Sequence, residues 1–414
     1  MRRPPATTLA AALLASAALL AATPGPAGAE TQRAARAAVA DREAARVHVV
    51  DLLSGAVLHT AATESPARLW RAPPPGGGAV ALVQSAAGVV AVLDLGVAAE
   101  PHGDHTDLRL ADPALRPGAV ARGPRPSHAV LSGDDGRLGV FFDGDGSVAV
   151  VEGEAVSPAA PADAPHHGAA VPFRDRDGTP MLAVSHAPAE REPPRGLELR
   201  RAGDGRAVAR TEDCPRLHGE GRTGPVLAFG CADGVLLLDA PSASFRKLAY
   251  PAGEGAAGSG RMVRNLVGGR DWRLLVGDFG PDALAVVDPD ADGGAGRLAV
   301  AALPGRRLHF AMDPDRAEHA FALTEDGTLH RVSTVEARVV ASSPAPLVGR
   351  YPLDAGSSPV RPRLSAAGGL VAITDPARGR LLVADADTLA VVREVALGGA
   401  PWDVMAVAAG GERH

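Results

Sequence analysis

The chain has 414 residues, of which 46% are apolar and only 3% aromatic, and its formal net charge is -6. The apolar fraction is ample for a large core and excludes a disordered chain, which would be poor in Val and Leu and strongly charged. Acidic and basic residues are interspersed, so the chain lacks the basic stripe that binding to nucleic-acid phosphates requires.

The N-terminus has the features of an export signal. Arg2 and Arg3 precede an apolar run over residues 9–22, and the segment ends in Ala27-Gly28-Ala29. A charged start, a short apolar stretch and an Ala-x-Ala ending are typical of a secretory signal peptide. The alternative, a membrane anchor, needs about 20 apolar residues. The sequence therefore predicts a signal peptide over residues 1–29 and an exported domain over residues 30–414, in the periplasm or extracellular space of a bacterium.

Short strands recur at a regular interval along the mature chain. Apolar runs such as residues 47–51, 80–84 and 370–374 alternate with turns rich in Asp and Gly. The second strands of successive units begin near residues 38, 80, 138, 181, 226, 274, 319 and 370. Four-stranded units of roughly 40 to 50 residues are typical of propeller blades. The pattern predicts an all-β, single-domain β-propeller with eight blades, and seven blades are the alternative.

The two ends of the mature chain predict how the ring closes. Residues 38–40, 47–51 and 56–58 supply three strands of one blade, and residues 402–407 supply an unpaired inner strand. Pairing these ends completes a blade and leaves no open sheet edge. With few aromatic residues, Val, Leu and Ala are expected to pack between the blades.

Histidines recur at one position of the repeat. The first strand of each propeller blade lines the central channel, and three successive blades enter it through Pro126-Ser127-His128, Pro165-His166-His167 and Pro215-Arg216-Leu217-His218. We expect His128, His167 and His218 to converge on the channel mouth. Three imidazoles together with a carboxylate or a fourth imidazole make a site suited to Zn²⁺, and a site that releases its metal needs a solvent-accessible edge. The alternative is that these histidines are packed or solvated residues without a ligand role.

The other histidines receive different interpretations. The segment His102-Gly103-Asp104-His105-Thr106-Asp107 precedes the third blade and can fold over the same mouth. His309 falls in the seventh blade, which is too far around the ring to join the three. The remaining histidines are predicted to be surface or tail residues: His48, His59, His186, His319, His330 and His414.

The chain has two cysteines, Cys214 and Cys231, and oxidation is the default outcome in an exported protein. If the turn over residues 221–224 folds a hairpin about its midpoint, the two cysteines face each other, which predicts a disulfide. A thiolate metal site is disfavoured because no Cys-x-x-Cys pair occurs.

Other motifs give no catalytic site. The segment from Asp288 to Gly293 matches the first half of a calcium loop, but Ala299 stands where the twelfth-position acid is needed, so a hairpin turn is predicted. No Gly-x-Ser-x-Gly, phosphate loop, dinucleotide fingerprint or His-Glu-x-x-His occurs.

Several of these motifs together resemble the AztD family of secreted zinc metallochaperones. The matching segments are His166-His167-Gly168, Glu212-Asp213-Cys214-Pro215, His218-Gly219-Glu220, Gly230-Cys231 and the His102 to Asp107 segment followed by Asp112-Pro113. The resemblance implies a protein that delivers Zn²⁺ to the solute-binding protein of a zinc ABC transporter. We expect a monomer that is not an enzyme.

The resemblance also assigns residues. It places zinc binding on His102, Asp104, His105, His128, His167 and His218, with Glu220 as a partner of a ligand. Two rival functions remain at this point: a propeller lactonase or dehydrogenase whose bound metal activates water, and a metal-free interaction scaffold.

Overall fold

The computed structural model describes Met1 and residues 32–72, 77–103, 105–132, 136–255, 258–353 and 360–411. Apart from Met1, the predicted signal peptide lies outside the described residues, as do Asp104 and His414. Within the described ranges, no helix is long and apolar enough to cross a membrane.

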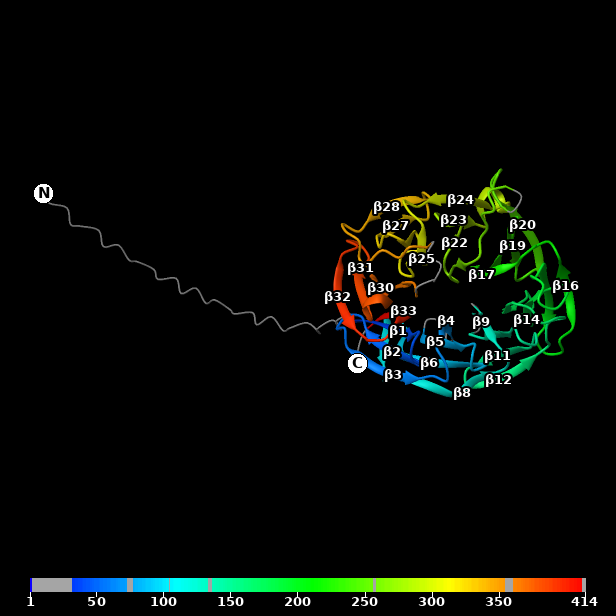
Figure 1. The fold of residues 1–414 in the computed structure, drawn as a ribbon, viewed down its shortest axis with the longest axis horizontal. Coiled ribbons are helices and arrows are strands. Elements are labelled where there is room, and N and C mark those ends of the chain that lie inside the picture. Colours follow the sequence, from blue (N-terminus) through cyan, green and yellow to red (C-terminus); the bar gives the residue numbers. More distant parts are fainter. Residues whose placement is uncertain are drawn as a thin grey trace.

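The strands form eight antiparallel sheets arranged as blades around a central axis, which confirms the predicted eight-bladed propeller (Figure 1). Blade 1 contains β33 (Pro401–Gly411), β1 (Gln32–Asp41), β2 (Arg46–Asp51) and β3 (Val57–Ala62). Blade 2 contains β4 (Arg68–Ala72), β5 (Gly77–Gln84), β6 (Val89–His102), β7 (His105–Leu110) and β8 (Ala114–Arg122).

The next three blades each contain four strands in chain order. Blade 3 contains β9 (Pro126–Leu131), β10 (Leu138–Phe142), β11 (Val148–Glu152) and β12 (Ala155–Ala159). Blade 4 contains β13 (Ala170–Arg174), β14 (Pro180–His186), β15 (Gly196–Arg201) and β16 (Ala207–Thr211). Blade 5 contains β17 (His218–Thr223), β18 (Val226–Gly230), β19 (Gly234–Asp239) and β20 (Ser244–Ala249).

The last three blades repeat this order. Blade 6 contains β21 (Leu266–Val267), β22 (Leu275–Asp278), β23 (Ala283–Asp288) and β24 (Arg297–Ala302), with the short α1 (Ala291–Gly294) in a turn. Blade 7 contains β25 (Arg307–Met312), β26 (His319–Thr324), β27 (Leu329–Ser333) and β28 (Arg338–Ser342). Blade 8 contains β29 (Leu364–Ala367), β30 (Leu370–Asp375), β31 (Arg380–Asp385) and β32 (Val391–Ala396), with the 3-10 turn η1 (Pro376–Arg378).

The ring closes in blade 1 as the terminal strands predict. Strand β33 pairs with β1 in an antiparallel register that includes Ala38 opposite Met405 and Ala35 opposite Ala408. Small and branched apolar side chains fill the space between blades 1 and 2, among them Ala38, Val49, Leu82 and Leu93. This pairing gives blade 1 its four strands, with β33 as the innermost one.

Blade 2 differs from the others because β6 pairs with β5 and, in addition, with two further strands. Its first half pairs with β8, and its second half, from Val97, pairs with β7. The change occurs at Gly96, whose φ of +70° favours glycine and whose added Cβ would lie 2.0 Å from the carbonyl oxygen of Ala111. The buried Arg36 guanidinium donates to the carbonyls of Leu95 and Ala111, which fixes the base of the β6–β7 hairpin against blade 1.

Candidate metal centre

The three histidines of the repeat meet at one mouth of the channel. His128 lies on β9, His218 begins β17, and His167 lies in the loop that enters β13. The ring centroids are 5.0 Å apart for His128 and His167, 5.2 Å for His167 and His218, and 6.2 Å for His128 and His218. The innermost strands of blades 3, 4 and 5 therefore bring these imidazoles together, and we call them the central cluster.

Each ring of the central cluster uses its Nδ1 atom to contact an oxygen acceptor. The acceptors are Glu220 Oε1 at 3.0 Å from His128, Asp143 Oδ2 at 2.7 Å from His167, and the carbonyl of Arg264 at 2.7 Å from His218. An oxygen acceptor places the proton of a neutral imidazole on Nδ1, so the lone pair is on Nε2. Such outer partners orient metal-binding histidines in known zinc sites.

The Nε2 atoms of His128 and His167 are 3.4 Å apart. Two nitrogens bound to one tetrahedral Zn²⁺ at about 2.0–2.1 Å would be roughly 3.3–3.4 Å apart, so this pair already has the spacing of a zinc site. The His167 side chain is 51% exposed, whereas the His128 side chain is 14% exposed, so the central cluster is open to solvent on one side.

The carboxylate of Glu220 sets the charge of the central cluster. Burial opposes charging of His128, but the facing Glu220 carboxylate outweighs it and raises the pKa of His128. Burial likewise opposes ionisation of Glu220, and the His128 charge and hydrogen bond outweigh it and lower the pKa of Glu220. Burial lowers the pKa of His218, with a contribution from the neighbouring His128. The pair of His128 and Glu220 thus holds a proton that a metal ion would displace.

A glycine allows the close approach that orients His218. Gly219 lies at a bulge between β17 and β18, with a φ of +73°. A Cβ added to it would lie 2.2 Å from the carbonyl oxygen of Arg264, the acceptor of His218. The backbone amides of Arg264 and Asn265 donate in turn to Asp278 Oδ1, which holds that carbonyl in place.

Two features of the central cluster were not predicted. Asp143 is not among the predicted site residues, yet its carboxylate contacts Ser127 and the amide of Gly168 as well as His167. The available signal was its position at the end of the second strand of blade 3, next to the entry of blade 4. Neighbouring His166 is a structural residue, because Ala164 and Ser185 satisfy its two ring nitrogens.

The histidines predicted to be ordinary surface residues include three buried ones, which corrects that expectation. His48, His186 and His330 are each less than 9% exposed, and Thr60, Asp163 and Thr324 respectively contact a ring nitrogen. Each buried ring has a polar partner at a ring nitrogen, so burial here serves packing. His309 lies in blade 7, across the channel from the central cluster.

A second group of potential ligands lies on the β6–β7 hairpin. His102, His105 and Asp107 offer ligand atoms that all lie within 4.8 Å of one another, and we call them the hairpin cluster. Asp107 is 3.6 Å from His102 Nδ1 and 3.3 Å from His105 Nε2. Asp107 was not among the predicted ligands, although it follows His105 by two residues. On a strand that spacing places both side chains on one face.

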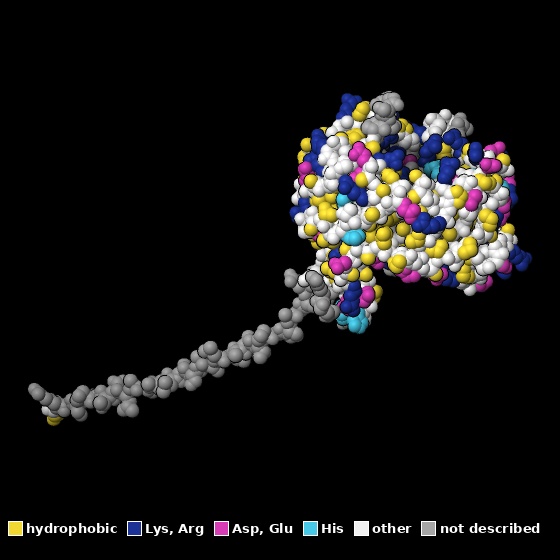
Figure 2. Space-filling view, turned by 60° about the horizontal axis from the view of Figure 1, so that its bottom comes forward, with side chains coloured by type: hydrophobic (Ala, Val, Ile, Leu, Met, Phe, Trp, Pro, Cys, Tyr) yellow, Lys and Arg dark blue, Asp and Glu magenta, His cyan; other side chains and the backbone are white. Residues whose placement is uncertain are grey.

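The hairpin cluster does not fold over the mouth that holds the central cluster, which corrects the expectation. Asp403, near the start of β33, contacts blade 2 at Leu69, whereas Gly411, at the end of β33, approaches Thr106 of β7. Eight residues of extended strand separate these points by roughly 26 Å. In the space-filling view, histidine and charged side chains gather at the tip of a projection below the ring (Figure 2).

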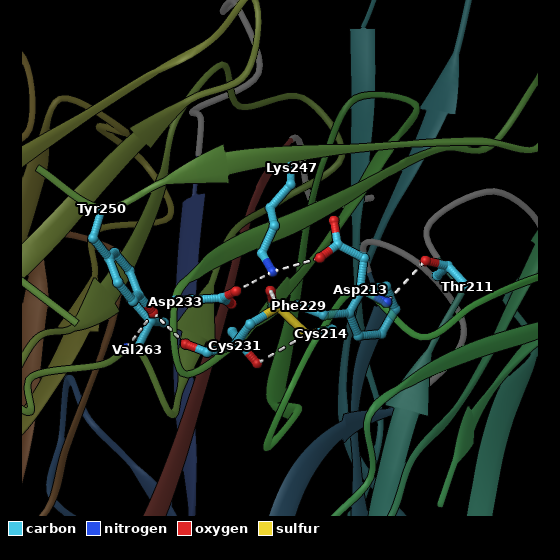
Figure 3. Close-up of a disulfide and its surroundings, with 10 residues drawn as sticks. Thr211, Asp213, Cys214, Phe229, Cys231, Asp233, Lys247, Tyr250 and Val263 are labelled. Atoms are coloured by element: carbon cyan, nitrogen blue, oxygen red, sulfur yellow. Dashed lines mark hydrogen bonds and ion pairs between the residues drawn. A yellow bond between two sulfur atoms is a disulfide. The ribbon is translucent and has the colours of Figure 1, made fainter. Parts of the chain in front are cut away.

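The predicted disulfide between Cys214 and Cys231 is present, with a Cα–Cα distance of 4.9 Å (Figure 3). The register used to predict it is wrong, because Thr223 faces Val226 and the turn is centred on Gly224 and Pro225. Both cysteines lie just outside the paired strands β17 and β18. The bridge therefore ties the loop that enters β17 to the loop that leaves β18.

Hydrogen bonds from Tyr250 and Lys247 link the residues around the disulfide. Tyr250 donates to the carbonyl of Cys231 at 2.7 Å and accepts from the amide of Val263 at 2.8 Å, and Lys247 bridges Asp213 and Asp233 (Figure 3). Since Cys214 is four residues before His218, this region also fixes the entry of the strand that carries one member of the central cluster.

The segment from Asp288 to Gly293 forms a turn between β23 and β24, as predicted. Asp288 is buried and pairs with Arg273 at 2.9 Å.

The fold and the two clusters define a β-propeller that carries two groups of potential metal ligands. A scan against models of protein families finds no match. The chain is 31% identical over 388 residues to a protein of Citrobacter koseri named zinc chaperone AztD, covering 91% of this chain and 87% of that relative. The chain belongs to the AztD zinc chaperone family, whose named relative is a chaperone and not an enzyme.

Solved structures of AztD also match this chain. The crystal structure of Citrobacter koseri AztD matches with a TM-score of 0.82 and 29% identity, over 92% of this chain and 100% of that one. The structure of apo AztD from the same organism matches with a TM-score of 0.79 and 28% identity, over 92% and 99%. The dihydro-heme d1 dehydrogenase NirN has a TM-score of 0.56 at 14% identity, over 89% and 74%, and shares the fold alone.

Proposed function

We propose that this protein is an exported zinc chaperone that binds Zn²⁺ at His128, His167 and His218 and delivers it to the solute-binding protein of a zinc ABC transporter. One observation carries the zinc assignment. Three imidazoles from three blades each present Nδ1 to an oxygen acceptor, which leaves their Nε2 atoms as potential metal ligands, and those of His128 and His167 are 3.4 Å apart. The family of the relative named zinc chaperone AztD supports zinc as the cargo.

The exposure of His167 supports transfer rather than permanent storage. A sealed four-ligand site is typical of structural zinc, whereas a site with three protein ligands keeps a position open. An incoming ligand of the partner can occupy the open position before the histidines release the metal. The side chain of His167, at 51% exposure, is the member of the central cluster that solvent and a partner reach most easily.

The hairpin cluster supplies a second zinc site in this proposal. Its His102 side chain is 74% exposed, its Asp107 side chain is 7% exposed, and the cluster lies at the opposite end of β33 from the central cluster. By its resemblance to the family, Asp104 joins His102 and His105 as a ligand there. Export through the predicted signal peptide over residues 1–29 places both sites where extracellular or periplasmic zinc is available.

Zinc binding is tested by competition against a chromophoric chelator with the purified mature chain. The parent should bind two equivalents. The variant H128A/H167A/H218A should lose at least 100-fold in affinity for one of them, while the matched variant H102A/H105A should lose only the other. Undiminished binding in the first variant would overturn the central site, and absence of binding by the parent would favour a metal-free scaffold.

Delivery is tested separately. The zinc-loaded parent is mixed with the metal-free solute-binding protein of the transporter from the same organism, the two proteins are separated, and the zinc in each is measured. Zinc should appear on the solute-binding protein faster than it leaves the parent for an equal concentration of chelator. Equal rates would contradict direct delivery while leaving zinc binding intact.

A further inference from the structure

Arginines line the channel wall, most of them on blades that do not carry the central cluster. A cavity of about 460 Å³ extends from His128 and Glu220 to these arginines. Its charged lining comprises Arg68, Arg71, Arg222, Arg307, Arg363, Glu220, Asp278 and Asp403. Cations thus outnumber carboxylates here, although the whole chain has a net charge of -6. Figure 2 shows Lys and Arg side chains around the hollow in the upper face of the molecule.

One carboxylate lies between two of these guanidinium groups without satisfying either. Asp403 accepts the backbone amides of Leu69 and Val404, both at 3.1 Å. Arg68 Nε and Arg363 Nη1 each remain 3.8 Å from it, which is beyond hydrogen-bond distance. In the part of the chain that the structure describes, no oxygen atom accepts a hydrogen bond from either guanidinium group.

The two guanidinium groups are close enough to affect each other. Burial, with the neighbouring charge of Arg363, lowers the pKa of Arg68. The Arg68 group also lies 4.8 Å from the ring centre of Trp402, so one of its faces is covered by an aromatic surface. Its N–H edge therefore remains the part available for a ligand.

His309 adds a third donor. Its Nδ1 accepts the backbone amide of Leu364 at 3.2 Å, so the neutral ring carries its proton on Nε2. That Nε2 atom is 3.4 Å from Arg363 Nη1, which is also a donor. Burial, together with Arg363, Arg68 and Arg307, holds the pKa of His309 well below its usual value, so the ring stays neutral near pH 7. Two donors that face each other need an acceptor.

Arg307 shows what a structural arginine looks like in the same cavity. Its guanidinium group donates to the carbonyls of Gly280 and Ala283 at 3.0 and 2.9 Å and to Asp278 at 3.4 Å. The contrast with Arg68 and Arg363 separates the arginines that build the fold from the arginines whose donors face the cavity.

We propose that Arg68, His309 and Arg363 form a binding site for a small oxyanion with at least two anionic oxygens, of the phosphate or di- and tricarboxylate class. The planar guanidinium groups suit two oxygens of one anion, and the His309 Nε2–H donates to a further one. A cavity of about 460 Å³ is within the size range of small-molecule sites. Binding of the anion does not require zinc delivery.

The site is tested by calorimetric titration of the metal-free mature chain at low ionic strength with inorganic phosphate, succinate and citrate in separate arms. We expect one saturable site for at least one anion. Preference for phosphate would identify a tetrahedral oxyanion, and preference for succinate or citrate would identify a carboxylate. Absence of saturable binding in all three arms would overturn the proposal.

Two variants make the test specific. R68Q/R363Q should weaken binding at least 10-fold, whereas the matched variant R71Q, which removes one charge from the same strand β4, should change it less than threefold. Equal weakening in both would indicate nonspecific attraction and overturn the site. If R68Q/R363Q does not fold, R363K keeps the charge, and it should still lose binding and lose the rise in melting temperature that the anion gives the parent.

Discussion

The two histidine clusters are built in opposite ways. The hairpin cluster comes from six consecutive residues on one turn, and its members would be neighbours in any β-hairpin of this register. The central cluster comes from three blades, and the contact between His128 and Glu220 joins residues that are 92 positions apart. Local sequence is enough for the first, and only a closed ring can assemble the second. Changes in the packing of the blades should therefore alter zinc affinity at the central cluster and leave it unchanged at the hairpin cluster.

Removing the disulfide should give the largest difference between the clusters. The bridge closes a loop with a sequence separation of 17 residues in blade 5, next to His218. The loop-entropy relation gives about 3 kcal/mol of stability for such a bridge. C214A/C231A should lower the free energy of unfolding by this amount in urea titrations and weaken zinc binding only at the central cluster. Unchanged stability, or equal weakening at the hairpin cluster, would contradict the comparison.

Removing the hydrogen-bond partners of the ring nitrogens should have the next largest effect on zinc affinity. Glu220 and Asp143 orient His128 and His167, and loss of such a partner typically costs about 10- to 100-fold in metal affinity. E220Q and D143N should each weaken zinc binding at the central cluster by this factor in chelator competition, with the hairpin cluster serving as the internal control. E212Q, an exposed acid outside both clusters, should leave both affinities unchanged.

The pH dependence of zinc binding should give the smallest effect. Zinc must displace the proton of His128, and Glu220 raises the pKa of that ring above its usual value of about 6.5. When the pH is lowered, zinc affinity at the central cluster should therefore begin to decrease while the pH is still above about 6.5. At lower pH the decrease caused by this proton should approach about tenfold per pH unit. In E220Q the onset should move to lower pH, because burial then acts without the opposing carboxylate. An unchanged onset would mean that Glu220 does not control this proton.

The arginine side of the channel extends the comparison to charge. His128 and Arg68 line one cavity, yet the first faces a carboxylate at 3.0 Å and the second has its nearest carboxylate at 3.8 Å. In our two proposals, a cation site and an anion site therefore share one cavity. The predicted phosphate or carboxylate binding tests whether that division is functional.

Much of the fold is determined by the sequence pattern. The spacing of apolar runs predicts eight units, and β5, β10, β14, β18, β22, β26 and β30 begin within three residues of the predicted second strands. The pairing of β33 with β1 follows from the incomplete blades at the two ends. These features are predictable because strand alternation and turn residues act locally.

The site is predictable only in part. The repeat position of His128, His167 and His218 predicts that they meet, since equivalent residues of neighbouring blades lie side by side. The repeat position does not predict that Asp143 orients His167. The place of the His102 to Asp107 segment before the third blade suggests the wrong mouth for the hairpin cluster. The disulfide is predicted correctly from a wrong register, because the cysteines lie outside the strands.

By itself the sequence determined the number of repeating units, the way the ring closes, the bonded cysteines and the three histidines that share a repeat position. Only the tertiary structure decided which oxygen holds each imidazole, which mouth each cluster occupies, and which arginines face the cavity. The physical reason is that repeat position sets a residue's place on its own blade. Contacts across the channel depend on how all eight blades pack into one ring.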